Sequence, residues 1–129
     1  MRDTPFSNAD MLDFFQGYVA CALWSSTDDE GNPMDENFGE HDIHSETQRA
    51  MWEDCVRFLR ENAADIVEMM AEADATMEII GHDFWLTRNY HGTGFWDRGA
   101  GDVGERLTDA AHAFGAFDLY VGDDGKVHA

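Results

Sequence analysis

The sequence predicts a single α+β domain over residues 1–129, with three N-terminal helices followed by a small antiparallel sheet and a fourth helix packed on it. Three observations predict this class. Apolar residues recur at helical spacing in four segments, residues 82–99 combine aromatic residues with glycines, and apolar residues alternate from Phe117 to Val121. At 129 residues, the chain can bury somewhat under about 70% of its unfolded surface, which suits one compact domain.

Capping signals and apolar periodicity predict the first two helices. Ser7 is a good N-cap for a helix over about residues 8–24, whose apolar face runs from Met11 to Leu23 and whose opposite face carries Gly17. The second helix begins at the capping box formed by Ser45 and Gln48 and extends to about residue 61.

Two further helices are expected later in the chain. The third covers about residues 63–80 and ends at Gly81 as its C-cap, with Asp65, Glu68 and Glu72 on its outer face and no Lys or Arg to neutralise them. The fourth covers about residues 102–114, between an N-cap at Asp102 and Gly115.

Two antiparallel strand pairs complete the predicted fold. Residues 82–99 are interpreted as two short aromatic strands joined by a glycine-rich turn, with Tyr90 and His91 at the tip. Within this stretch, Arg88 or Arg98 is expected to pair with Asp83 or Asp97. A strand from Phe117 then turns through the GDDG sequence at 122–125, and residues 126–128 pair back.

Four segments resemble a recurrent group of small acidic proteins encoded by bacteriophages and other mobile elements. They are HDFWLTRNYHGTGFWDRG (82–99), ALWSSTDDEG (22–31), ENFGEHDI (36–43) and LYVGDDGK (119–126), and the resemblance covers most of the chain. It implies a phage product that acts inside a bacterial host. It transfers no catalytic residue to this chain.

The chain is strongly acidic, with 27 acidic and 8 basic residues and a net charge of −19. Such a protein repels nucleic acids and anionic membranes and attracts basic surfaces. Residues 25–44 are expected to form a long loop, which lacks any Lys or Arg. Its seven carboxylates are those of Asp28, Asp29, Glu30, Asp35, Glu36, Glu40 and Asp42.

The acidic loop and the third helix together suggest a nucleic-acid mimic. Closely spaced carboxylates of Asp65, Glu68, Glu72 and the loop could occupy a groove whose Lys and Arg side chains normally bind phosphates. The predicted function is therefore inhibition of a basic, nucleic-acid-binding host protein, of the anti-CRISPR or anti-restriction type. No direct contact with nucleic acid or membrane is expected. An ordinary solvated surface or adaptation to salt would also account for the charge.

Two other functions remain open from the sequence. The aromatic hairpin at 84–98, with Tyr90 at its tip, could be a protein-protein interaction module, since Trp, Tyr and Arg are frequent interface anchors. A small metal-dependent hydrolase is the other alternative, because His41, His82, Asp83 and Asp109 could be aligned with the metal ligands of histidine-aspartate phosphohydrolases. Zinc-site spacing, an EF-hand loop and a P-loop are absent from the sequence. We assign no catalytic residue, metal ligand or cofactor.

The cysteines and the N-terminus favour a cytoplasmic protein. Cys21 and Cys55 both fall in predicted helices, which suggests reduced thiols rather than a disulfide framework. The N-terminal residues carry charge where a signal peptide needs an apolar run. The longest uncharged run, residues 14–27, is too short to span a bilayer.

Overall fold

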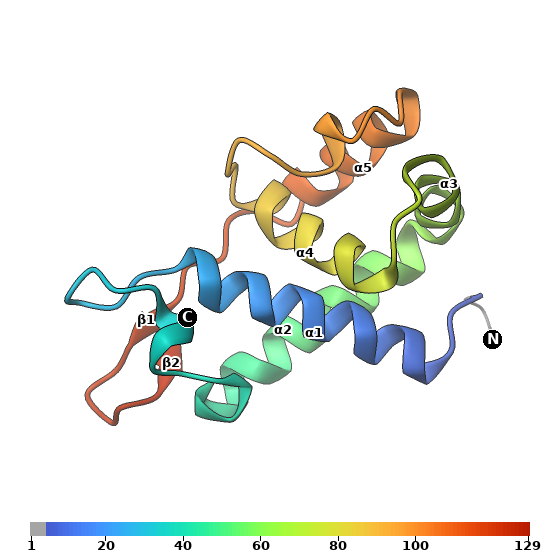
Figure 1. Ribbon diagram of the computed structural model, residues 1–129. Coiled ribbons are helices and arrows are strands. Elements are labelled where there is room, and N and C mark those ends of the chain that lie inside the picture. The colour runs from blue at the N-terminus through green and yellow to red at the C-terminus, as the bar shows by residue number, and fades with distance from the viewer. Residues whose placement is uncertain (1–4) are drawn as a thin grey trace.

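The structure, a computed structural model, describes residues 5–129 and is mostly helical (Figure 1). The predicted α+β class is wrong, because the described residues contain five α-helices and only one two-stranded sheet. The α-helices are α1 (Asn8–Ser25), α2 (Ser45–Glu61), α3 (Ala63–Ala73), α4 (Met77–Arg88) and α5 (Asp102–His112). The short elements are the 3₁₀ helices η1 (Met34–Glu36), η2 (Glu40–Asp42) and η3 (Phe95–Asp97) and the strands β1 (Tyr120–Val121) and β2 (Val127–His128).

Three of the predicted helices and the C-terminal strand pair are confirmed. α1 begins at a capping box in which Ser7 and Asp10 satisfy each other's backbone N–H groups. α2 and α5 occupy the expected segments, but both predicted N-caps are wrong: His44 rather than Ser45 caps α2, and Gly101 rather than Asp102 precedes α5. In the hairpin, Tyr120 lies opposite His128, but the first strand begins at Tyr120 and not at Phe117 as predicted.

The fold centres on the crossing of α1 and α4, which touch through two glycines. A Cβ atom on Gly17 would lie 2.0 Å from the carbonyl oxygen of Glu78. A Cβ on Gly81 would lie 2.0 Å from the carbonyl oxygen of Phe14. The two predictions made for these glycines are therefore wrong: Gly17 does not face outward and Gly81 does not end a helix. Both positions need glycine so that the helix backbones can approach.

The predicted single helix over residues 63–80 is also wrong, because two helices meet there. α3 ends at Asp74, which has a left-handed backbone with φ 52°. α4 then begins after Thr76, whose Oγ1 accepts a hydrogen bond from the backbone N–H of Ile79 at 3.2 Å. Asp and Thr thus act as the C-cap and N-cap of successive helices.

The predicted aromatic hairpin at 82–99 is wrong, since its first half belongs to α4 and its second half is a loop containing η3. α4 is buried around most of its circumference, and Phe84, Trp85 and Arg88 are at most 2% exposed. A helix enclosed in this way has no polar face, so its sequence lacks the amphipathic period that identifies helices. The prediction of strands at 82–99 therefore depends on aromatic content alone.

An aromatic core surrounds α4. Phe58 of α2 stacks on Phe84 of α4 with ring centroids 4.1 Å apart, and Phe14 and Phe95 pack against Phe58 at 6.2 and 5.8 Å. All four rings have an exposed fraction of 0%. This cluster joins α1, α2, α4 and η3 around one core. None of the described helices is both long and apolar enough to cross a membrane.

Candidate functional site

The structure separates the two parts of the predicted carboxylate surface. The loop at 28–42 precedes the N-terminus of α2, whereas α3 follows its C-terminus. α2 has 17 residues. With a rise of about 1.5 Å per residue, its ends lie roughly 25 Å apart. In Figure 1 the loop and the hairpin lie at the left, and α3 lies at the upper right. The loop and α3 therefore do not form one continuous surface.

The prediction that no Lys or Arg neutralises the acids of α3 is also wrong. Arg106 of α5 donates from Nε to Asp65 at 3.1 Å and from Nη2 to Glu68 at 3.4 Å. This pairing leaves no local signal in the sequence, because Arg106 lies 41 residues from Asp65. Glu72 remains exposed and has no ion-pair partner among residues 5–129. The outer face of α3 is thus largely an ordinary salt-bridged surface.

The loop at 28–42 is ordered by hydrogen bonds from its backbone N–H groups to two of its own carboxylates. Asp28 accepts the backbone N–H groups of Glu30 and Asn32, both at 2.9 Å. Asp42 accepts the N–H of Gly39 at 2.8 Å. Met34 anchors the loop in the core with an exposed fraction of 0%. Asp28 and Asp42 are therefore loop-shaping residues, and the remaining loop acids project from a fixed backbone.

These loop acids lie beside the C-terminal hairpin, and together they form what we call the acidic end. The backbone N–H of His44 donates to the carbonyl of Val127 at 2.8 Å, and Ile43 forms a β-bridge with the same residue. The predicted carboxylate surface does not include Asp118 and Asp123, because nothing in the sequence shows that residues 118–124 lie beside the loop. Asp124 of the hairpin is exposed but pairs with His128. The exposed carboxylates of the acidic end that form no ion pair are those of Asp29, Glu30, Asp35, Glu36, Glu40, Glu46, Asp118 and Asp123.

Little positive charge lies near the acidic end. Residues 25–48 contain no Lys or Arg, and residues 107–129 contain only Lys126. Within the described part of the chain, neither Lys126 nor Arg49 forms an ion pair with any of the eight carboxylates. The carboxylates of the acidic end therefore face solvent without a basic side chain to neutralise them.

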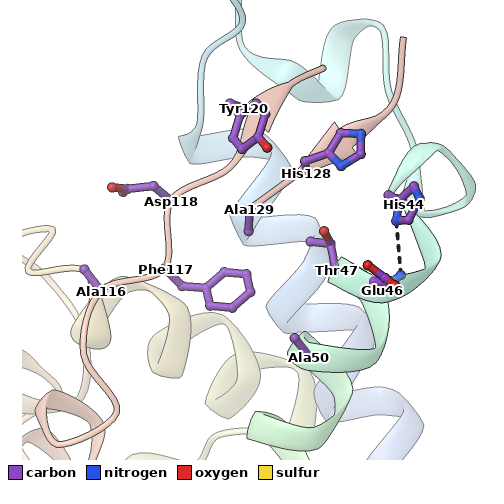
Figure 2. Close-up of a pocket in the computed structure, with 10 residues that line it drawn as sticks. All are labelled: His44, Glu46, Thr47, Ala50, Ala116, Phe117, Asp118, Tyr120, His128 and Ala129. Atoms are coloured by element: carbon purple, nitrogen blue, oxygen red, sulfur yellow. Dashed lines mark hydrogen bonds between the residues drawn. The ribbon is translucent and has the colours of Figure 1, made fainter. Parts of the chain in front are cut away.

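A groove of about 750 Å³ opens between the N-terminus of α2 and the C-terminal hairpin (Figure 2). Phe117 and His128 project into it from the hairpin side, and Thr47 faces them from α2. The His44 and His128 rings stack with centroids 4.8 Å apart, and His128 Nε2 lies 3.0 Å from the Asp124 carboxylate. The groove thus lies within the acidic end and has aromatic walls.

Tyr90 is exposed as expected, but its predicted position at a hairpin tip is wrong. It follows the C-cap of α4 with a left-handed backbone of φ 58°. Its side chain stacks on the ring of His112 with centroids 4.1 Å apart. Of the tryptophans in the predicted hairpin, Trp85 is 2% exposed and Trp96 is 53% exposed. The proposed aromatic interaction surface therefore does not exist as a hairpin.

The residues considered for metal-dependent hydrolysis are not brought together. His41 lies in η2, His82 and Asp83 lie in α4, and Asp109 is exposed on α5. Asp83 is already held by Arg98 through contacts of 2.7 and 3.0 Å. Among residues 5–129, no three His, Cys, Asp or Glu side chains are grouped so that they could hold a metal ion.

The two cysteines are free and buried, one in α1 and one in α2. Burial raises the pKa of Cys21 to about 12, with the Asp83 charge adding to the effect. Burial likewise raises the pKa of Cys55 well above its ordinary value. Thiols with such pKa values stay protonated at neutral pH and are poor nucleophiles. This environment suits packing rather than covalent catalysis.

Comparison of the chain with models of known protein families, with curated proteins and with solved structures finds no significant match.

Proposed function

We propose that this protein inhibits a basic, nucleic-acid-binding protein of a bacterial host by occupying its nucleic-acid groove with the acidic end. The observation that carries the proposal is a set of exposed, unneutralised carboxylates on an ordered loop and hairpin. A defence nuclease, restriction enzyme or CRISPR effector in the bacterial cytoplasm is the expected target. The resemblance to phage-encoded acidic proteins supports this context.

The placement of the arginines supports the acidic end over α3 as the contact surface. Most of the described arginines form ion pairs away from the acidic end, so they do not reduce its charge. Those pairs are Arg57 with Glu61, Arg88 with Asp54, Arg98 with Asp83, and Arg106 with Asp65 and Glu68. The acidic end therefore keeps its charge, whereas two of the three predicted acids of α3 are paired with Arg106.

The order of the loop also supports binding to a phosphate-binding groove. Duplex DNA presents one negative charge per about 1.7 Å of axis, and its binding proteins place Lys and Arg to match. A competitor must present carboxylates at fixed positions, because ordering a flexible loop on binding would weaken the complex. The hydrogen bonds accepted by Asp28 and Asp42 fix the loop before any partner arrives.

The proposal is tested with a variant in which four acids of the acidic end are neutralised: Asp29→Asn, Glu30→Gln, Asp35→Asn and Glu36→Gln. Its matched control neutralises four exposed acids elsewhere: Asp13→Asn, Glu53→Gln, Glu105→Gln and Asp109→Asn. Both variants have the same net charge. Binding to a panel of purified bacterial nucleases, restriction enzymes and CRISPR effectors is measured by size-exclusion chromatography and calorimetry.

The wild type should form a stoichiometric complex with a panel member, and raising the salt concentration should dissociate it. The acidic-end variant should lose binding by at least about tenfold, whereas the control should change little. Equal losses in both variants would mean that net charge alone acts, as on a solvated or salt-adapted surface. No complex with any member of the panel would contradict the proposal.

A further inference from the structure

The groove within the acidic end contains a polar group that the fold leaves unsatisfied. Thr47 is 7% exposed, and its hydroxyl forms no hydrogen bond with any residue of the part of the chain described here. Its side chain projects into the groove, opposite Phe117 and Ala129 (Figure 2). A buried hydroxyl without a protein partner costs free energy unless water or a ligand satisfies it. The Thr47 hydroxyl can therefore accept a hydrogen bond from water or from a ligand in the groove.

The groove walls favour a planar cation. Three rings line them in series: His44 stacks on His128 at 4.8 Å, and His128 stacks on Tyr120 at 5.6 Å. Phe117 adds a fourth ring on the hairpin side. Of these rings, Tyr120 and Phe117 are of the kind whose faces attract cations, and a guanidinium group can also stack flat on an uncovered ring face.

The charges at the groove also favour a cation. The carboxylates of Glu46 and Asp118 are exposed, line the groove and form no ion pair with any described residue. No Lys or Arg lines the groove. An anionic ligand would have to enter the most acidic part of the molecule, whereas a cation would be attracted to it.

We propose that the groove receives an arginine side chain from the basic protein, with the guanidinium stacked on the aromatic wall and donating to the Thr47 hydroxyl and Glu46. Arginine is favoured over lysine because its planar fork can stack and donate several hydrogen bonds at once, whereas an ammonium group is compact and strongly hydrated. This inference rests on the proposed function, in which the partner exposes arginines that normally bind phosphates. The inference adds one specific contact, between a guanidinium group and the groove, to the electrostatic attraction of the acidic end.

The test titrates ¹⁵N-labelled protein with N-acetyl-arginine amide and follows the backbone NMR signals of Thr47, Phe117 and His128. N-acetyl-citrulline amide is the matched neutral probe, and N-acetyl-lysine amide is the matched ammonium probe. The arginine probe should give saturable shifts at the groove. The citrulline probe should give none, and the lysine probe should bind several-fold more weakly.

Two variants assign the contact to named groups. Thr47→Val keeps the shape of the side chain and removes the hydroxyl, so it should weaken arginine binding by about tenfold. Glu46→Gln removes one charge at an exposed position and should weaken it several-fold, whereas the control Glu53→Gln on the same helix should not. Circular dichroism checks that each variant folds.

Absence of groove shifts with the arginine probe would overturn the inference, as would equal binding of the arginine and citrulline probes. Equal binding of the lysine probe would overturn the assignment to guanidinium. Arginine binding in the groove without any complex with basic proteins would support this site and contradict the proposed function. A salt-sensitive complex that Thr47→Val leaves unchanged, with no arginine shifts, would support that function and overturn the groove contact.

Discussion

The carboxylate of Asp83 accepts two hydrogen bonds from the guanidinium of Arg98, from Nε at 2.7 Å and from Nη2 at 3.0 Å. Asp83 is 1% exposed, whereas the Arg98 side chain is 37% exposed. The pair ties the loop after α4 back onto that helix. It confirms the expectation that an arginine of residues 82–99 pairs with an aspartate of the same stretch, although the backbone around it is helical.

Replacing Arg98 with Gln should lower the free energy of unfolding by about 3 kcal/mol, because it leaves the buried Asp83 carboxylate without its cation. The double variant with Asp83→Asn should recover part of this loss. Urea denaturation of both single variants and the double variant gives the coupling free energy. A coupling below about 0.5 kcal/mol would mean that the pair is no more important than an exposed salt bridge.

Replacing Gly81 with Ala should destabilise the fold by at least about 3 kcal/mol, because the new methyl group would collide with the backbone of α1 near Phe14. The same argument holds for Gly17→Ala. Gln16→Ala, on the exposed side of α1, is the control and should change stability by less than about 0.5 kcal/mol. Thermal denaturation compares the three variants, and a neutral Gly81→Ala would show that the helices do not cross this closely.

Arg88 should hold the C-terminal segment, including the hairpin, against the helices. Its Nη1 donates to Tyr18 and Asp54, both at 2.9 Å. Nε and Nη2 donate to the carbonyls of Gly115 and Phe114 at 2.8 and 3.1 Å. Arg88→Lys keeps the charge but cannot make all four contacts, so it should cost about 3 kcal/mol and speed hydrogen exchange after residue 114.

Arg60→Lys, at an exposed position of α2, provides the control for Arg88→Lys. It should change the free energy of unfolding by less than about 0.5 kcal/mol and leave exchange in the hairpin unchanged. Hydrogen exchange followed by mass spectrometry measures both variants. If Arg88→Lys lowered only global stability, without faster hydrogen exchange over residues 114–128, Arg88 would not hold the C-terminal segment against the helices.

Asp97 should make stability depend on pH in the acidic range. A hydrogen bond from the Thr93 hydroxyl, at 2.8 Å, and one from the Gly94 N–H lower the pKa of its carboxyl. The folded pKa is below the unfolded value of about 3.9, so the stabilisation is present above that value and is lost as the pH falls through the folded pKa. The free energy of unfolding of the wild type should therefore exceed that of Asp97→Asn, and this difference should be larger at pH 6 than at pH 3. A pH-independent difference between the two melting curves would contradict this assignment.

The helices that could be predicted from the sequence are those with an exposed polar face or a clear N-cap. α1 has its Ser7 capping box, and α2 and α5 carry apolar stripes against polar faces. α4 could not be found by the same signals, because it is buried nearly all round. Thr76 before an apolar run is the signal for its start, but Gly81 has the sequence pattern of a helix end.

The candidate site could be predicted only in part, because it depends on contacts between distant segments. The acidity of the loop at 28–42 is visible in the sequence, whereas its proximity to the hairpin depends on the pairing of Ile43 with Val127. The neutralisation of α3 by Arg106 likewise depends on packing. The groove at Thr47 leaves no local sequence pattern, because its walls come from two segments far apart in the sequence, residues 44–50 and 116–129.

The most direct test of the central claim is a competition between this protein and duplex DNA for one basic target from the panel. Fluorescence anisotropy of labelled DNA on the target is followed as the protein is added at several salt concentrations. We predict that the protein displaces the DNA completely and competitively, and that its apparent affinity falls steeply with salt. A ternary complex with DNA still bound, or binding that does not respond to salt, would contradict occupation of the nucleic-acid groove by the acidic end.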